Sequence, residues 1–285
     1  MPDWHVVGRN IGVASATFVL VLGVVYAGSL WLFWAYEPAF VFYQLKRPGI
    51  APQTVGLKGF AEVGVATEDG LRLYGWWRPP EPGHGAIVVF TGTGVTLSDY
   101  GGLLGDLAGH GFGVLGIDYR GNGASPGTPS EAAWRSDARA AFDFVRAAVP
   151  QAKIALFGQS MGTGFAVGLA LDRPAVGVLL DSPYASVVRL SELSGMPILR
   201  VPYPARLLMT NTIDSEAMIG KLRVPVMMLH GTEDYAIPIG EARRLYAAAP
   251  EPKELIEVVG AYHAQVWFGP QRERALAALA AWTAP

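Results

Sequence analysis

The sequence predicts an α/β protein with a mostly parallel central sheet, preceded by one long apolar helix. Three observations predict it. Short apolar runs of strand length alternate along the chain with longer helical segments, which is typical of repeated βα units. A Gly-x-Ser-x-Gly sequence at residues 158–162 lies between one such strand and the helix after it. Near the N-terminus, the 26 residues from 11 to 36 carry no charge.

Composition limits the chain to one catalytic domain and excludes several chemistries. The chain has 285 residues, 51% of them hydrophobic, which is enough for one α/β domain with an appendage. A net charge of −2 without a basic aromatic patch argues against nucleic-acid binding. The absence of cysteine excludes disulfides and a thiol nucleophile. Since none of the five histidines has metal-pair spacing, we expect neither a metal nor another cofactor.

The N-terminal segment 1–36 is expected to contain a transmembrane helix at about 11–36. As a helix this run would be ~39 Å long, more than the hydrocarbon core of a bilayer. Trp31, Trp34 and Tyr36 at its end are typical of an interfacial aromatic belt. A cleaved signal peptide is the alternative, but the run is longer than a signal core and lacks a convincing cleavage site. We therefore expect a single-pass membrane protein.

Charges next to the apolar run do not decide which side of the membrane holds the rest of the chain. Arg9 precedes the run, while Lys46 and Arg47 follow it, so the orientation stays open. Residues 37–56 contain three prolines and are expected to form an irregular connector. The catalytic domain is expected at 57–285.

The expected domain begins with a β-hairpin and continues as βα units. Residues 61–65 and 71–76 flank a turn at Glu68-Asp69-Gly70. Residues 86–90 are apolar throughout, as a strand buried on both faces would be. Further strands are expected at 113–117, 154–157, 176–180, 224–229 and 255–259, with helices near 98–108, 130–148, 163–171, 241–249 and up to 282. This order predicts a mostly parallel sheet with helices on both faces.

A cap insertion is expected at about 183–222. These 40 residues separate successive strands, where a plain crossover would need far fewer. The segment is rich in apolar residues, which either pack the cap onto the sheet or line the mouth of the site. They are Leu190, Leu193, Met196, Pro197, Ile198, Leu199, Val201, Tyr203, Leu207, Leu208 and Met209.

The strand before Ser160 and the helix after it predict a nucleophile elbow. Such a turn exposes the serine hydroxyl at the top of the sheet, and the N–H of the next residue, Met161, faces a developing oxyanion. Gly158 and Gly162 let the strand and helix backbones approach closely. A second donor is expected from Thr93, in the loop after the strand at 86–90. That loop lacks the lysine of a phosphate-binding P-loop, so nucleotide binding is rejected.

A second Gly-x-Ser-x-Gly sequence occurs at residues 123–127 and is interpreted differently. Pro126 follows Ser125 and has no N–H for an oxyanion, and no helical run begins there. Ser125 is therefore expected to be a loop residue.

A serine nucleophile needs a base and a carboxylate that orients the base, and the histidines can be sorted by position. His5 precedes the apolar run, His84 lies in a turn and His110 lies at a helix end. His230 closes a strand and is expected to orient the loop after it. His263 follows the last strand, at the carboxyl end of the sheet, where this architecture places its sites. His263 is therefore the predicted base.

Two aspartates compete for the role of the acid. Asp234 lies in the loop after the strand at 224–229, while Asp181 ends the preceding strand. Asp234 gives the chain order Ser, Asp, His and has a longer loop to direct its carboxylate. We therefore favour Asp234, keep Asp181 as the alternative and interpret Glu233 as a solvated neighbour.

From about residue 56 onward the chain resembles the α/β-hydrolase superfamily, and within it membrane-anchored serine hydrolases related to the serine aminopeptidase-like and protein-depalmitoylating branches. The resemblance rests on Thr67-Glu68-Asp69-Gly70 with Gly75-Trp76-Trp77, Asp118-Tyr119-Arg120-Gly121, residues 158–162, His230-Gly231-Thr232-Glu233-Asp234 and Gly260-Ala261-Tyr262-His263, in that order. It implies Ser160 as nucleophile, Asp234 as acid, His263 as base, and Met161 and Thr93 as oxyanion donors. Where relatives usually have His-Gly-Asn, this chain has Thr91-Gly92-Thr93, so the bracing of that loop is unexplained.

The expected activity is hydrolysis of a carboxylic ester or thioester, of an acyl chain, through an acyl-enzyme. The class is that of carboxylesterases, thioesterases and lipases. The alternatives are a serine peptidase and a non-catalytic, membrane-tethered binding protein. The expected partners are a small-molecule or acylated substrate and the lipid bilayer. The acyl group, the leaving group and the oligomeric state stay open, because one scaffold serves many substrates.

Overall fold

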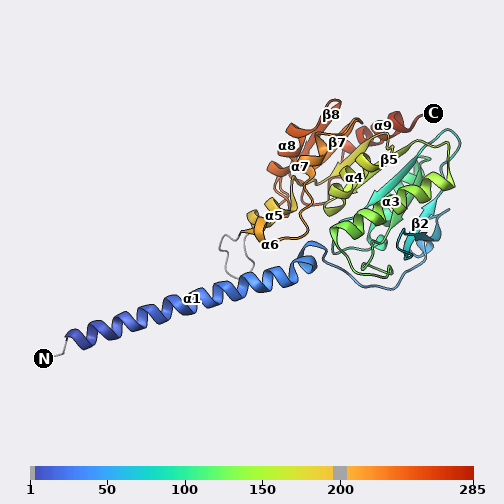
Figure 1. Ribbon diagram of the computed structural model, residues 1–285. Coiled ribbons are helices and arrows are strands. Elements are labelled where there is room, and N and C mark those ends of the chain that lie inside the picture. The colour runs from blue at the N-terminus through green and yellow to red at the C-terminus, as the bar shows by residue number, and fades with distance from the viewer. Residues whose placement is uncertain (1–3, 195–203) are drawn as a thin grey trace.

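The computed structural model describes residues 4–194 and 204–285 (Figure 1). Within them, eight strands form one sheet in the order β1-β2-β4-β3-β5-β6-β7-β8. The strands are β1 Ala61–Ala66, β2 Arg72–Arg78, β3 Ala86–Phe90, β4 Gly113–Ile117, β5 Ile154–Gln159, β6 Val178–Asp181, β7 Val226–Gly231 and β8 Lys253–Val258. The helices are α1 Trp4–Val41, α2 Gly101–Gly109, α3 Glu131–Ala148, α4 Met161–Asp172, α5 Val187–Ser194, α6 Ala205–Leu208, α7 Ser215–Ile219, α8 Ile239–Ala248 and α9 Gln271–Thr283, with 3₁₀ turns η1 Pro52–Val55 and η2 Leu97–Tyr100.

The sheet confirms the expected α/β architecture. β1 and β2 form the antiparallel hairpin, with Val65 opposite Leu73, and β2 also runs antiparallel to β4. The pairs from β4 through β3 to β8 are all parallel. Every residue of β3 is buried, because helices cover both faces of the sheet. The apolar run that the sequence assigned to a central strand therefore lies at the centre.

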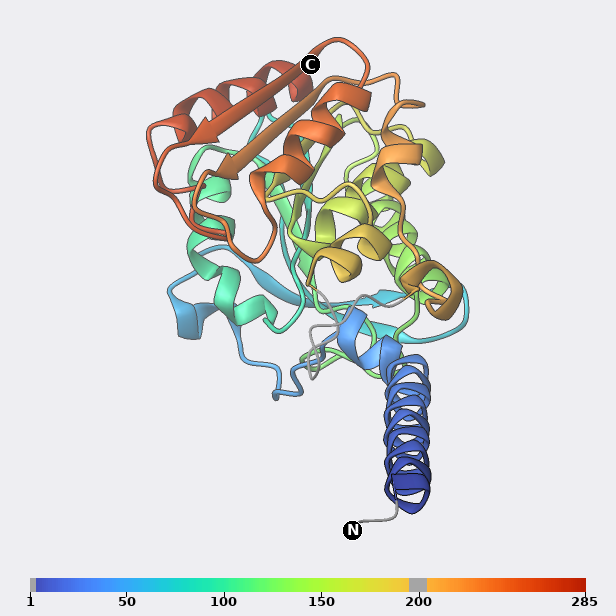
Figure 2. The same cartoon turned by 90° about the vertical axis from the view of Figure 1, so that its left-hand side faces the viewer.

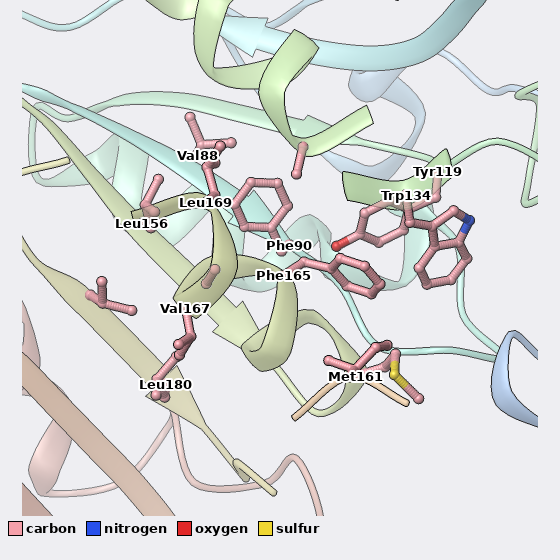
Figure 3. Packing of buried hydrophobic residues seen from close by; sticks show 14 of the residues in the cluster. Val88, Phe90, Tyr119, Trp134, Leu156, Met161, Phe165, Val167, Leu169 and Leu180 are labelled. Atoms are coloured by element: carbon pink, nitrogen blue, oxygen red, sulfur yellow. The ribbon is translucent and has the colours of Figure 1, made fainter. Parts of the chain in front are cut away.

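Side chains of β3 alternate between two apolar clusters, one on each face of the sheet. Val88 and Phe90 join the cluster that α3, α4 and the cap cover, whereas Ile87 and Val89 join the cluster under α2 and α9. Figure 3 shows the first cluster around stacked aromatic rings, where Tyr119 and Trp134 lie 4.1 Å apart between ring centroids. This rigid layer supports β5 and α4, the two elements that carry the predicted nucleophile.

The cap lies between β6 and β7 and contains α5, α6 and α7. Some of its apolar side chains pack against the core of the protein, since Val188, Met209 and Ile213 are buried. Leu193 and Leu207 are exposed instead. Residues 196–199, 201 and 203, which the sequence also assigned to this apolar set, lie outside the described residues.

The helix near the N-terminus is longer than the sequence predicted. The expected end was residue 36, but α1 continues through Pro38 to Val41. The expected connector therefore begins with a further helical turn, and Phe42 N donates to Pro38 O. Residues Arg9–Val41 are long and apolar enough to cross a membrane, a property that a signal sequence shares. Figures 1 and 2 show α1 projecting from the body of the molecule.

Candidate active site

Ser160 lies in the strained turn that the Gly-x-Ser-x-Gly sequence predicted. β5 ends at Gln159 and α4 begins at Met161, and Ser160 between them has φ 52° and ψ −122°. A positive φ on a residue with a Cβ costs about 1–3 kcal/mol and occurs where the surrounding structure enforces it. Here the flanking glycines allow the close approach. A Cβ at Gly158 would lie 2.7 Å from Gly162 O, and one at Gly162 would overlap Phe90 O.

Three side chains that the sequence singled out lie in one hydrogen-bonded row. His263 Nε2 is 3.0 Å from Ser160 Oγ, and His263 Nδ1 is 2.8 Å from Asp234 Oδ2. The other oxygen of Asp234 accepts hydrogen bonds from the N–H groups of Ala236 and Ile237, at 3.0 and 2.8 Å. The carboxylate is therefore fixed from both sides, and the imidazole joins it to the serine.

The pKa of Asp234 lies below its ordinary value. Burial by itself would raise this pKa, but the hydrogen bonds from His263 and from the Ile237 N–H, together with the nearby imidazoles, outweigh it. Asp234 is therefore ionised at neutral pH. An ionised acceptor at Nδ1 keeps the histidine proton there and leaves Nε2 free to accept the proton of Ser160.

His230 holds the loop that presents Asp234. It is fully buried, and its Nε2 lies 2.8 Å from Ile237 O and 3.4 Å from Asp234 Oδ2. Burial lowers the pKa of His230, so the ring is neutral. The sequence interpretation gave this histidine the same task.

The loop at 91–93 is braced by a residue that the sequence did not single out. Gly92 N donates to Tyr100 Oη at 2.9 Å, and Tyr100 in turn donates to Gln159 Oε1. A Cβ at Gly92 would lie 3.2 Å from Ser160 Cβ, so this loop passes directly beside the nucleophile. Within residues 4–194 and 204–285, no hydrogen bond occupies the Thr93 N–H.

Asp181, the alternative acid, belongs to the same buried network. Gln159 Nε2 donates to its Oδ2 at 2.8 Å, and Ser182 Oγ lies 3.0 Å from its Oδ1. In the described part of the chain, no hydrogen bond joins it to His263. Burial raises the pKa of Asp181 to about 6, although the Gln159 hydrogen bond opposes that rise. Ser182 Oγ also accepts from Ala264 N at 3.2 Å, so the network reaches the histidine loop.

Two other regions that the sequence motifs pointed to, around Ser125 and Arg120, make structural contacts and are not part of the hydrogen-bonded row of Ser160, His263 and Asp234. Ser125 is buried, and its Oγ donates to Asp118 O and accepts from Tyr74 N. Arg120 bridges Asp137 of α3 and Asp69 of the hairpin turn. Both therefore fasten the antiparallel edge of the sheet to its centre.

Comparison with known proteins agrees with this architecture. A family model described as serine aminopeptidase, S33, matches residues 81–201. The chain is 34% identical over 250 residues to the uncharacterized protein Rv2307c of Mycobacterium tuberculosis, with 86% of each chain covered. It is 32% identical over 200 residues to the alpha/beta hydrolase domain-containing protein aho-3 of Caenorhabditis elegans, covering 66% of this chain and 55% of that one.

The chain belongs to the α/β-hydrolase superfamily. Among solved structures, this α/β-hydrolase is similar to an esterase of Pyrococcus furiosus, with a TM-score of 0.68 and 21% identity over 82% of this chain and 94% of that one. At this level of identity the similarity concerns the fold alone.

Proposed function

We propose that this α/β-hydrolase is a membrane-anchored serine hydrolase that cleaves a carboxylic ester or thioester of an acyl chain. Ser160 is the nucleophile, His263 the base and Asp234 the acid. The observation that carries the proposal is the unbroken hydrogen-bonded row from Ser160 Oγ through both ring nitrogens of His263 to Asp234. The strained turn at Ser160 supports it, because backbone strain of this kind clusters at active sites.

Acylation begins when Ser160 Oγ attacks the carbonyl carbon and its proton moves to His263 Nε2. The N–H groups of Met161 and Thr93 stabilise the oxyanion that forms. The bond to the leaving alcohol or thiol then breaks, and His263 gives that group the proton. The acyl group is now an ester of Ser160.

Deacylation repeats these steps with water. His263 takes a proton from water as its oxygen attacks the acyl-enzyme carbonyl. The bond to Ser160 Oγ breaks, the serine recovers its proton and the carboxylic acid leaves. No redox step or co-reactant besides water is required.

A fluorophosphonate probe tests the nucleophile. We expect the full-length protein to be labelled, Ser160→Ala to lose both labelling and ester hydrolysis, and Ser125→Ala to keep both, since Ser125 lies in a structural hydrogen-bond pair. Loss of labelling in the Ser125 variant with an unchanged melting temperature would overturn the assignment. An unlabelled wild-type protein would favour a non-catalytic binding role.

A serine peptidase is the second candidate, because the matching family model bears that description. Amide cleavage would use the same acylation but would require His263 to protonate an amine. Turnover of an acyl ester and an aminoacyl amide should be measured side by side. We expect the ester to be the better substrate, and faster amide cleavage would favour the peptidase.

The anchor is part of the proposal as well. Its support is the helix Arg9–Val41, and the alternative is a signal sequence that is removed. The mass of the mature chain distinguishes them, since an uncleaved anchor keeps the first 40 residues. We expect the intact mass, recovered in the membrane fraction.

A further inference from the structure

Glu37 is an isolated charge in the apolar N-terminal region. Between Arg9 and Lys46 it is the one charged residue of the sequence. A carboxylate next to a membrane-spanning segment is costly unless protein groups receive it. Its side chain is buried, with 1% of the residue exposed.

The cap supplies the groups that receive Glu37. Oε1 accepts from Asn211 N at 3.1 Å, while Oε2 accepts from Thr210 Oγ1 and Asn211 Nδ2, both at 2.9 Å. Three donors thus converge on one acid, and an ionised carboxylate, which only accepts, satisfies them all. These partners lie 173 and 174 positions away in the sequence.

Glu37 belongs to a stripe along one face of α1 that the body of the protein covers. Its members recur every three or four residues, the spacing of one helix face. They are Tyr26, Leu30, Phe33, Glu37 and Val41, of which the last three are buried and the first two partly buried against the main apolar cluster. The last four turns of α1 are therefore docked on the protein.

The docked cap segment leads directly to the helix of the nucleophile. Ile213, two residues after Asn211, packs on α4, since a Cβ at Gly164 would lie 2.6 Å from its Cγ2. α4 begins at Met161, next to Ser160. The anchor and the predicted site are therefore joined through packed side chains.

The geometry of α1 fixes where the cap would lie relative to a bilayer. About 20 helical residues cross the hydrocarbon core, so the stretch from Arg9 to about residue 29 suffices. The remaining 12 residues of α1, up to Val41, form ~18 Å of helix, which would lie in the headgroup layer and extend past it into water. α6 contacts α1, and Figure 1 shows it beside the half of α1 that is nearer the body of the protein. On the cap, Leu207 is 84% exposed and Leu193 53% exposed.

We propose that Glu37 docks the cap against the anchor at the membrane surface, and that the cap face carrying Leu207 and Leu193 binds the lipid bilayer. The proposal rests on the proposed function, in which α1 is a membrane anchor, and it adds that the substrate enters the site from the bilayer, past the cap. Acyl substrates held in the bilayer would meet the cap beside the site. α6, which carries Leu207, contacts both the apolar helix α1 and α5, which carries Leu193, and this neighbourhood favours lipid as the occupant of the exposed leucines.

Lipid contact can be measured directly because the chain has no cysteine. Leu207→Cys and Leu193→Cys are each labelled with an environment-sensitive fluorophore in the full-length protein, in vesicles of phosphatidylcholine and phosphatidylglycerol. Gln151→Cys is the control, an exposed position just before the amino end of the central strand β5, whereas the cap follows the carboxyl end of β6. Brominated lipid should quench the labels at 207 and 193 at least twofold and leave 151 unchanged. Labels at 207 and 193 that behave like the one at 151 would overturn the proposal.

Glu37→Gln tests the docking contact. Glutamine keeps one acceptor oxygen but replaces the other with an NH2 group that faces a donor, so the contact is weakened while the size of the side chain is kept. The matched control is Glu273→Gln, an exposed acid on α9. In the labelled Leu207→Cys protein, Glu37→Gln should abolish most quenching and Glu273→Gln should not. Unchanged quenching in Glu37→Gln would show that Glu37 does not hold the cap.

Hydrolysis of a soluble ester separates this proposal from the proposed function. Glu37→Gln should keep soluble-ester turnover within about threefold, which also verifies folding, and should slow hydrolysis of an ester presented in vesicles. If the wild-type protein hydrolyses no ester, the proposed function fails while the quenching result stands on its own. If Glu37→Gln slows both substrates equally, the role in membrane presentation is wrong.

Discussion

The two carboxyl groups near His263 differ in what they bind. Asp234 receives the imidazole and two backbone N–H groups, whereas Asp181 receives Gln159 and Ser182. Burial raises the pKa of both, but only Asp234 has enough donors to bring its pKa below the ordinary value. At the scale of single residues, this difference supports the proposal that Asp234 orients the base, while Asp181 braces the turn at Ser160 through Gln159.

Asp234→Asn should lower ester turnover by about 10⁴, because an amide stabilises the wrong tautomer of His263. Asp181→Asn should keep turnover within about tenfold. Both are compared with wild type in kcat for a p-nitrophenyl ester. A large loss at Asp181 with a small one at Asp234 would move the acid to the end of β6.

Asp181 should also make the free energy of unfolding depend on pH, because burial raises its pKa. Its pKa is about 6 in the folded chain against an ordinary 3.8, so between these values the folded state binds the proton and the unfolded state does not. Stability from this group is therefore fully present below pH 4 and is lost as pH rises through 6. Relative to Asp181→Asn, wild type should lose up to about 3 kcal/mol of unfolding free energy from pH 4 to 7. Parallel urea-denaturation profiles across this range would contradict the assignment.

Tyr100→Phe should lower kcat about tenfold with little change in KM. The variant removes the acceptor of the Gly92 N–H and the donor to Gln159, so the loop that holds Thr93 loses its brace. Tyr119→Phe is the matched control, because the buried Tyr119 hydroxyl has no hydrogen-bond partner in the described part of the chain. Equal activity of the two variants would exclude a positioning role for Tyr100.

At the scale of elements, the turn between β5 and α4 and the cap differ in how they are held. The turn carries Ser160, and the cap lies between β6 and β7. The turn is fixed by packing, since the glycines around Ser160 leave no room for a Cβ. The cap is a mixture, with Met209 and Ile213 buried and Leu207 in solvent. Its inner face therefore packs on the core of the protein, while Leu207 on its outer face is left exposed.

If apolar residues of the cap line the mouth of the site, the activity should depend on the length of the acyl chain of the substrate. Each methylene that a substrate buries contributes roughly 0.8 kcal/mol, or about fourfold in binding. We expect kcat/KM for p-nitrophenyl esters to rise from acetyl to hexanoyl. A preference for acetyl would show that the cap only packs on the sheet, and it would leave the row of Ser160, His263 and Asp234 untouched.

At the scale of the whole molecule, α1 is both the proposed anchor and a part of the folded body. Its first turns stand free of the body, whereas Phe33, Glu37 and Val41 are buried in it. Cutting the chain before or after this docked stretch should therefore have different consequences.

A chain that lacks residues 1–25 should melt within a few degrees of the full-length protein in the same detergent. A chain that lacks residues 1–41 should melt about 10 °C lower or more, because it loses two buried apolar side chains and the hydrogen bonds of Glu37. Both are measured by thermal denaturation. Equal melting temperatures would mean that the last turns of α1 add nothing to the fold.

Local chemistry explains why most elements could be predicted from the sequence. The strand expected at 86–90 is β3, residue for residue, because a wholly apolar run of that length fits a central parallel strand. The helix expected from residue 130 begins at Glu131 with Ser130 as its N-cap. The turn at Ser160 was predictable for the same reason, since its glycines are adjacent in the chain.

Sequence by itself determined the fold class, the turn that contains Ser160 and the place of His263 after the last strand, because each depends on neighbouring residues or on strand order. Only the tertiary structure shows which of the two aspartates bonds to His263, because Asp181 ends β6 and Asp234 lies in the loop after the adjacent parallel strand β7, so both follow strands at the carboxyl end of the sheet. It also revealed Tyr100 bound to Gln159, 59 positions away, and Glu37 bound to Asn211, 174 positions away. Such partners leave no local pattern, because a hydrogen bond depends on where the fold brings two side chains and not on their separation in the chain.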